Sequence, residues 1–527
     1  MSKAAAIAKV SAKSSFHYLW GLVISTLISS VGTIFIARML NPDQYGLYLV
    51  VLTVPNLLVT FGNLGMNSAI IRFTAQFRAE GRTDEIRSIY LSGILFQLVL
   101  GLILTFFSFF FADFLATNLF SRPAIAPLIQ IVSFAVLANS IVVTATATFT
   151  GYEKMELNSI MLIVQSVFKT ALIIGLVALG FGAAGATIGF TSGVIFASIV
   201  GMILIWTIYR RLPKPYSHKL EIKAYLTAML TYCLPLSVVT VISGLLPQFY
   251  AFLLPIHYAT DNTMIGNYGV AMNFVVLITF FSIPITSMLF PAFSKLDPEK
   301  DIDALKSAFQ FSVKYASLLV VPVTAIVICL SQPAVETLFG TVYNTAPLFL
   351  ALLAIQYLYT ALGNLSLSGF LNGQGKTKYV LKLALLNGSI GFPMGYLLIM
   401  AYGVIGLIVT TLVSALPGIF LGLRFIQKNY GITVDWLSSA KILFSSAIAA
   451  SVTYAAISLM HFSSWITLIL GVLLFIVVFI PSALLTRSIN QFDIVNLCDM
   501  TSSLGTVGKI LKTILGIFGK LMTYFKL

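Results

Sequence analysis

The sequence predicts an all-α polytopic membrane protein with about 14 transmembrane helices. Hydrophobic residues make up 58% of its 527 residues and charged residues only 9%, and the mean hydropathy is +0.98. Such a chain has too few polar side chains to cover a soluble particle of its size. Apolar runs long enough to cross a bilayer predict spans near residues 16–40, 46–73, 88–113, 122–150, 158–180, 185–209, 224–255, 264–293, 307–330, 345–371, 379–402, 404–426, 442–459 and 466–485.

The basic residues are concentrated in alternate loops. When successive loops are assigned to opposite sides of the membrane, one side holds 27 of the 31 lysines and arginines, and the other holds only Arg38 and Arg122. The remaining two, Lys169 and Lys314, fall inside predicted spans. Because lysine and arginine favour cytoplasmic loops, we predict a cell-membrane protein with both termini in the cytoplasm. The net charge of +14 therefore reflects topology, and we expect no nucleic-acid partner.

An internal repeat at an offset of about 220 residues organises the spans. The matches join 45–48 to 265–268, 84–88 to 303–307, 151–154 to 373–376, and Gly185 to Gly406. Six spans separate equivalent positions, so the two copies have the same orientation. This is a parallel repeat related by an axis along the membrane normal, which predicts a substrate path between two six-helix lobes.

The repeat and the charge pattern together predict the domain boundaries. They divide the chain into a cytoplasmic N-terminus (1–15), an N-lobe (16–209), a cytoplasmic linker (210–223), a C-lobe (224–427), a helix pair (442–486) and a cytoplasmic tail (487–527). No small-residue cleavage site follows the first apolar run, so we expect an uncleaved first span.

The tail has the pattern of a basic amphipathic helix. Helical spacing places Lys509, Lys512 and Lys520 on one face, while Ile514 and Phe518 fall opposite. This pattern is typical of a helix lying in the membrane interface. The helix would act either as a simple anchor or as an element that recruits substrate or a partner.

Two spans carry lysines with polar neighbours. Lys169 continues a stripe with Asn158 and Gln165, and Lys314 lies one helical turn after Gln310. A lysine near the bilayer centre costs about 2.5–3.5 kcal/mol even on permissive scales, so it usually faces a protein or water-filled interior. The alternative for Lys314 is that its side chain reaches the nearby cytoplasmic surface.

Amide side chains add to this polar interior. Asn56, Asn63 and Asn67 follow one face of the second predicted span, and Gln248 and Asn273 lie in spans seven and eight. Any single amide could instead join neighbouring helices. Apart from Asp113 and Glu336 at span ends, no acidic residue lies inside a predicted span, so the interior is cationic and amide-rich and suits an anion better than a cation.

Catalytic and cofactor sites are not indicated. Cys233, Cys329 and Cys498 have no histidine partners at metal-ligand spacing. Residues 373–377 end like a phosphate-binding loop, but Phe370 stands where that motif requires glycine. In the external loops the charged residues are scattered singly, and no two of them have the spacing of a catalytic acid–base pair. We therefore expect neither an enzyme nor a metal or cofactor site.

Three segments carry a resemblance to a known family. They are residues 36–46 (Ile-Ala-Arg-Met-Leu-Asn-Pro-Asp-Gln-Tyr-Gly), 64–65 (Leu-Gly) and 69–72 (Ala-Ile-Ile-Arg). In these the chain resembles the oligosaccharide flippases of the multidrug/oligosaccharidyl-lipid/polysaccharide exporter superfamily. The resemblance implies two lobes that alternate between inward- and outward-open states. Relatives often carry an acidic residue near the position of Gln248, and its absence here argues against carboxylate-based ion coupling.

The implied cargo is a glycan linked to polyprenyl phosphate or pyrophosphate, moved from the cytoplasmic to the outer leaflet. Membrane lipids and glycan-assembly enzymes are the other expected partners. We predict that Lys169, Lys314 and Arg72 attract the lipid phosphate and that Arg38 lies near the exit. The sugars are expected to contact the cleft amides, which are Asn56, Asn63, Asn67, Gln165, Gln248, Asn273 and Gln310.

Two other functions remain open at this point. A cation-coupled drug or metabolite exporter of the same superfamily would need a carboxylate inside the membrane. A non-transporting scaffold for envelope assembly would need no polar cleft.

Overall fold

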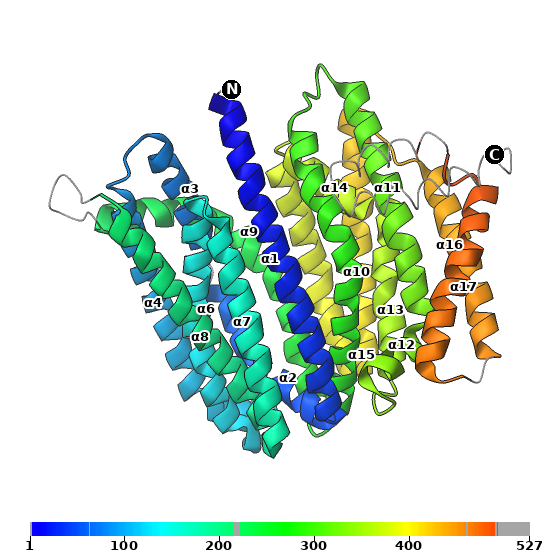
Figure 1. Ribbon diagram of the computed structural model, residues 1–527, viewed down its shortest axis with the longest axis horizontal. Helices are drawn as coiled ribbons and strands as arrows, with labels where there is room; N and C mark the ends of the chain where they lie inside the picture. The colour runs from blue at the N-terminus through cyan, green and yellow to red at the C-terminus, as the bar shows by residue number, and fades with distance from the viewer. Residues whose placement is uncertain (1–2, 63, 214–221, 460–461, 491–492, 494–527) are drawn as a thin grey trace. The chain divides into compact units, whose positions relative to one another are not determined.

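The structure, a computed structural model, describes residues 3–62, 64–213, 222–459, 462–490 and residue 493, and no strand occurs among them (Figure 1). The α-helices are α1 (Lys3–Met39), α2 (Pro42–Gly62), α3 (Met66–Ala79), α4 (Ile86–Phe110), α5 (Ala112–Phe114), α6 (Ala126–Gly151), α7 (Met155–Leu176), α8 (Gly182–Arg211), α9 (Ile222–His257), α10 (Thr263–Ser294), α11 (Ile302–Cys329), α12 (Ser331–Phe339), α13 (Ala346–Leu358), α14 (Asn364–Gly373), α15 (Thr377–Tyr430), α16 (Trp436–Ser458) and α17 (Ser464–Leu485). Short 3-10 and π-helical turns occupy Leu115–Leu119, Pro123–Ile125, Val177–Phe181 and Tyr359–Leu362.

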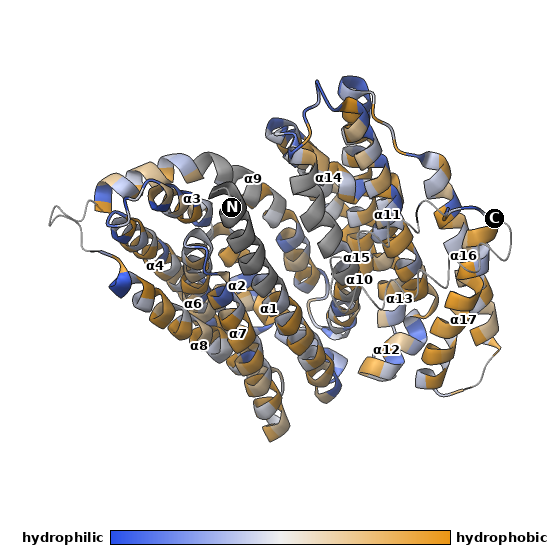
Figure 2. Cartoon of the chain, turned by 45° about the horizontal axis from the view of Figure 1, so that its top comes forward, coloured by the Kyte–Doolittle hydropathy of each residue, from blue (hydrophilic) through white to orange (hydrophobic). Residues whose placement is uncertain are grey.

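The helices have the length and composition of membrane spans. Within the described residues, nine helical segments are long and apolar enough to cross a bilayer, or ten if the bent pair Ala346–Leu362 and Asn364–Gly373 forms one span. Figure 2 shows hydrophobic residues along α4, α8 and α17, with hydrophilic residues nearer the helix ends and loops. The chain is therefore an all-α polytopic membrane protein, as predicted. The count of fourteen spans stays a prediction.

Two glycine turns interrupt the longest helical segments at equivalent positions. Gly182 has φ 52° and ψ −137°, and Gly403, 221 residues later, has φ 57° and ψ −128°. A residue with a Cβ atom rarely adopts this conformation. Gly403 lies inside α15 where we predicted the end of one span and the start of the next. The same backbone turn therefore joins two predicted spans in each copy of the repeat.

The turns at 151–154 and 373–376 are also built alike. Lys154 donates its backbone N–H to Phe149 and Lys376 to Leu371, both at 2.8 Å. The third residue of each turn has a positive φ, 57° at Glu153 and 67° at Gly375. The first copy thus places a glutamate where the second has the more permissive glycine. Arg78 contacts the Glu153 carboxylate at 2.8 Å.

Repeat-equivalent glycines meet where α2 and α10 begin. A Cβ atom on Gly46 would lie 1.9 Å from the carbonyl oxygen of Asn262, and one on Gly266 would lie 2.1 Å from that of Pro42. Gly266 lies 220 positions after Gly46, and Asn262 lies 220 positions after Pro42, so each copy makes the same contact with the other. This reciprocity is what a two-fold axis running between the helices produces, and it supports the parallel repeat.

Contacts divide the chain into two compact units, which differ in extent from the lobes predicted from the sequence. The first comprises Met1–Gly269 and Gly388–Leu407. In it α7 packs between α1 and α8, α6 packs against α4 and α8, and α9 packs against α2, α3 and α4. Buried residues of these helices, including Met66, Ile89 and Phe149, form its main apolar cluster. The predicted lobe boundaries stay predictions.

The second unit comprises Val270–Asn387 and Ile408–Leu527. Here α11 packs against α13 and α16, and α17 packs against α16 and α12. Phe293, Phe309 and Phe370 centre its apolar cluster. The final helix pair α16–α17 was predicted from the sequence. The amphipathic helix predicted in the tail lies outside the described residues.

The second predicted span, 46–73, is not one helix. It divides into α2 and α3 at Gly65, which has φ 71°. A Cβ atom on Gly65 would lie 2.9 Å from the carbonyl oxygen of Cys233 on α9, so glycine also permits this close approach. The prediction that Asn56 and Asn67 follow one face of one helix is therefore wrong. The break separates them.

Candidate functional site

Lys169 lies where α7 is held between two other helices. A Cβ atom on Gly193 of α8 would be 2.5 Å from the Lys169 Cα, and one on Gly189 would be 2.6 Å from the backbone N of Ile173. On the other side, Ser29 of α1 donates a hydrogen bond to the Ser166 hydroxyl at 3.2 Å. Small residues permit such close helix approach in membranes. The position of Lys169 is thus fixed by its neighbours' backbones.

The charged end of Lys169 has no counter-ion in the part of the chain that the structure describes. The residue is partly exposed, as is Gln165 one turn earlier on α7. Neither side chain forms a hydrogen bond or ion pair with a described residue. A lysine within a membrane-spanning helix is costly unless it meets an anion, water or a polar group. The arrangement leaves this cation available to a ligand.

Arg38 and Arg72 lie at opposite ends of α2. Arg38 is exposed in the last turn of α1, before α2 begins. Gly32 of α1 faces Thr170, so Arg38 lies about 9 Å further along α1 than the level of Lys169. Arg72 is exposed on α3, and its guanidinium carbon lies 4.2 Å from the centre of the Tyr232 ring on α9. Such stacking orients a guanidinium while leaving its N–H groups accessible.

The predicted amides of the first unit differ in their surroundings. Asn56 is exposed on α2, next to Pro55, and Gln248 on α9 is partly exposed. Asn67 is partly exposed, but its Oδ1 is buried without a hydrogen-bond partner among the described residues. Asn63 lies outside the described residues.

The second unit contains Lys314, Gln310 and Asn273. Lys314 on α11 forms an ion pair with Asp493, with Nζ 2.6 Å from Oδ2. Gln310, one turn earlier, donates to the backbone carbonyl of Thr433 at 3.1 Å. Asn273 is partly exposed on α10. Unlike Lys169, Lys314 already has an anionic partner.

Sequence reasoning missed the role of Asp493. It lies only 8 residues beyond the end of α17, in the segment that we assigned to the tail, and no spacing rule connects it to Lys314 179 residues earlier. Its side chain is 1% exposed. A search for acids inside spans cannot find a carboxylate that folds back onto a span from outside.

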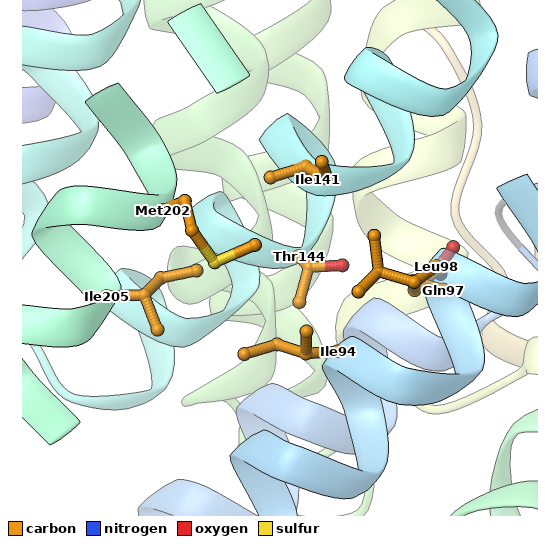
Figure 3. Close-up of a pocket in the computed structure, with 7 residues that line it drawn as sticks. All are labelled: Ile94, Gln97, Leu98, Ile141, Thr144, Met202 and Ile205. Atoms are coloured by element: carbon orange, nitrogen blue, oxygen red, sulfur yellow. The ribbon is translucent and has the colours of Figure 1, made fainter. Parts of the chain in front are cut away.

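A buried amide was also missed. Gln97 on α4 is 1% exposed, and neither its Oε1 nor its Nε2 has a partner among the described residues. It borders a narrow pocket in which Ile94, Ile141 and Met202 gather near Thr144 (Figure 3). The pocket has no room for a water molecule. The unpaired amide of Gln97 therefore lowers the stability of the fold, and the pocket beside it is too narrow for a ligand.

We expect Gln97→Met to stabilise the protein by about 1–2 kcal/mol, because it removes two unsatisfied polar groups at nearly constant volume. The matched control is Gln374→Met, which removes hydrogen bonds to the carbonyls of Phe293 (2.6 Å) and Leu296 (3.1 Å) and should destabilise. Thermal unfolding in detergent compares the two. A lower melting temperature for Gln97→Met would mean that the amide has a bound partner in the membrane.

An apolar groove lies on the same unit between α4 and α6. Its volume is about 550 Å³, and it is lined by Leu102, Ile103, Thr105, Phe106, Phe109, Phe110 and Phe134. It contains no charged side chain and none of the predicted site residues. Such a surface suits hydrocarbon, which is the expected environment of a membrane-spanning helix.

Comparison with known proteins gives the family. A family model described as "Polysaccharide biosynthesis protein" matches residues 11–297. An uncharacterised membrane protein of Methanocaldococcus jannaschii is 24% identical over 380 residues, covering 69% of this chain and 74% of that one. The probable low-salt glycan biosynthesis flippase Agl15 of Haloferax volcanii is 23% identical over 237 residues, covering 44% of this chain and 49% of that one.

A solved structure shares the fold. The Lipid II flippase MurJ in an inward closed conformation has a TM-score of 0.71 at 16% sequence identity, covering 89% of this chain and 98% of that one. At this identity the likeness shows the fold alone. The fold described above therefore occurs in a solved structure.

Proposed function

Because the chain belongs to the polysaccharide biosynthesis protein family, we propose that it is a flippase for an oligosaccharide linked to polyprenyl phosphate or pyrophosphate. It moves this lipid from the cytoplasmic to the outer leaflet by alternating access through a cationic cleft. The internal repeat supports this, since transporters built from repeats place the substrate path at the repeat interface. The protein would lie in the cell membrane with both termini in the cytoplasm.

The observation that carries the proposal is Lys169. It is a membrane-embedded cation, fixed between α1 and α8 and without a counter-ion among the described residues. A phosphate supplies the charge that this ammonium lacks and accepts short, charge-assisted hydrogen bonds. A cationic drug would be repelled at the same position.

The other predicted residues also contact the transported lipid. Arg72 attracts the phosphate at one end of α2 and Arg38 receives it at the other, and Lys314 also attracts the phosphate. The amides Asn56, Asn63, Asn67, Gln165, Gln248, Asn273 and Gln310 hydrogen-bond the sugars along the path. Glycan-assembly enzymes would supply the lipid-linked substrate.

The membrane potential should drive this export. A phosphate carries negative charge out of a negative-inside cell, and each charge crossing 100 mV gains about 2.3 kcal/mol, equivalent to about a 50-fold shift between leaflets. We therefore expect proteoliposomes holding a fluorescent polyprenyl pyrophosphate disaccharide to export it faster with an inside-negative potential. Fluorescence quenching from the outside measures the rate.

The control lipid is the same disaccharide on an uncharged polyprenol. It should show no dependence on potential and little transport. Equal flipping of both lipids would exclude phosphate recognition. Transport of an organic cation, with neither lipid flipped, would replace the proposal with a cation exporter.

A further inference from the structure

The ion pair between Lys314 and Asp493 joins α11 to the chain beyond α17. Nζ and Oδ2 are 2.6 Å apart, and the side chains of Lys314 and Asp493 are 11% and 1% exposed. Asp493 also accepts a hydrogen bond from the backbone N–H of Asn490 at 2.8 Å. The lysine thus keeps an accessible edge, while the carboxylate is enclosed.

A folded turn carries Asp493 to this position. After α17, the Ser488 backbone and hydroxyl both donate to the carbonyl of Ala483, at 3.0 and 2.9 Å. Asp493 donates its own backbone N–H to the carbonyl of Asn490 at 3.0 Å. Hydrogen bonds in the turn after α17 therefore help to hold Asp493 next to Lys314.

A second carboxylate lies within the electrostatic range of the same lysine. Asp435 caps α16, accepting hydrogen bonds from the Ser438 backbone at 3.1 Å and the Ser438 hydroxyl at 2.5 Å. Burial opposes ionisation, but the Ser438 hydrogen bonds and the charge of Lys314 leave the pKa of Asp435 below its ordinary value. The charge of Lys314 therefore acts on Asp435 as well as on Asp493, and it is Asp493 that forms the ion pair with it.

We propose that Asp493 is a positioning residue for the transported lipid: it occupies Lys314 in the absence of substrate, and the lipid phosphate displaces it. The inference rests on the proposed function. Phosphate and carboxylate compete for the same N–H donors. When Asp493 leaves Lys314, the described turn that follows α17 loses its ion pair with α11, so substrate binding is linked to release of this turn.

Binding to the detergent-purified full chain tests the competition, with farnesyl phosphate as the probe and farnesol as the uncharged control. Asp493→Asn keeps the side chain's size and removes the competing charge. We expect it to tighten farnesyl phosphate binding about tenfold, and Lys314→Gln to weaken it about tenfold. The double variant should bind like Lys314→Gln, because Asp493 acts only through Lys314. Farnesol binding should not change.

Release of the turn has its own readout. The backbone N–H groups of Asn490 and Asp493 are hydrogen-bonded within this turn, so their hydrogen–deuterium exchange can be followed by peptide mass spectrometry. Farnesyl phosphate should change the exchange rate of the wild type to that of Asp493→Asn, which itself should not respond. A rate unaffected by the ligand would overturn the linkage.

The possible outcomes distinguish failure of the Asp493 proposal from failure of the proposed function. If the wild type binds farnesyl phosphate through Lys169 but Asp493→Asn binds no better, the ion pair is purely structural and the inference fails alone. If Asp493→Asn weakens binding and lowers the melting temperature, the same conclusion holds. If the wild type prefers farnesol or binds neither lipid, the proposed function fails with it.

Discussion

Lys169→Gln is expected to reduce flipping of a polyprenyl pyrophosphate disaccharide by about 100-fold, equivalent to about 3 kcal/mol. The substitution keeps a polar side chain but removes the positive charge of Lys169, which lies where α7 crosses α8. The phosphate would then cross the membrane interior without its charge-assisted hydrogen bonds. Initial flipping rates in proteoliposomes, corrected for the amount of inserted protein, measure the effect.

Lys169→Arg should keep most of the activity, because it restores the positive charge at the same place. Lys378→Gln serves as the matched control: Lys378 is exposed at the start of α15, and its loss should change little. Correct insertion can be verified from the melting temperature, which the Lys169 variants should leave near that of the wild type. Undiminished flipping by well-folded Lys169→Gln would remove the observation on which the proposed function depends.

Gly46→Ala and Gly266→Ala should both destabilise the protein, and by similar amounts. Each added methyl group would overlap a backbone carbonyl oxygen, at 1.9 and 2.1 Å, and a backbone cannot move aside as a flexible side chain can. Overpacking of this kind typically costs about 1–3 kcal/mol. Thermal unfolding in detergent should show a clear fall in the melting temperature for each variant.

The double variant Gly46→Ala/Gly266→Ala distinguishes this contact from two unrelated defects. Because both methyl groups force the same pair of helices apart, its destabilisation should be smaller than the sum of the single effects. Gly175→Ala is the control, since a Cβ atom there meets nothing within 4 Å. Additive effects, or single effects as small as that of Gly175→Ala, would contradict the tight crossing of α2 and α10.

The fold class and the family followed from local features of the sequence and are confirmed. Apolar runs identify membrane helices because the bilayer forces backbone polar groups to pair within each segment. The repeat was visible because turns need particular residues, such as those at 151–154 and 373–376. The break at Gly65 was not predicted, since an apolar run continues through it and only the close approach of α9 explains it.

Contacts between distant residues could not be predicted in the same way. Lys169 and Lys314 looked alike as lysines inside spans, but one has no counter-ion among the described residues and the other meets Asp493. That difference arises from tertiary packing between residues far apart in the sequence, and no sequence motif or fixed spacing identifies such a pair. The roles of the predicted site residues therefore stay predictions that the variants above can test.

The reciprocal contact of Gly46 and Gly266 has the form of an isologous interface, in which two copies present the same patch to each other. Here both patches belong to one chain, so the two halves relate to each other at this point as the subunits of a two-fold homodimer do. Pro42 and Gly46 in one half must fit Asn262 and Gly266 in the other. The halves can diverge freely elsewhere, but at this crossing a change in one copy constrains the other.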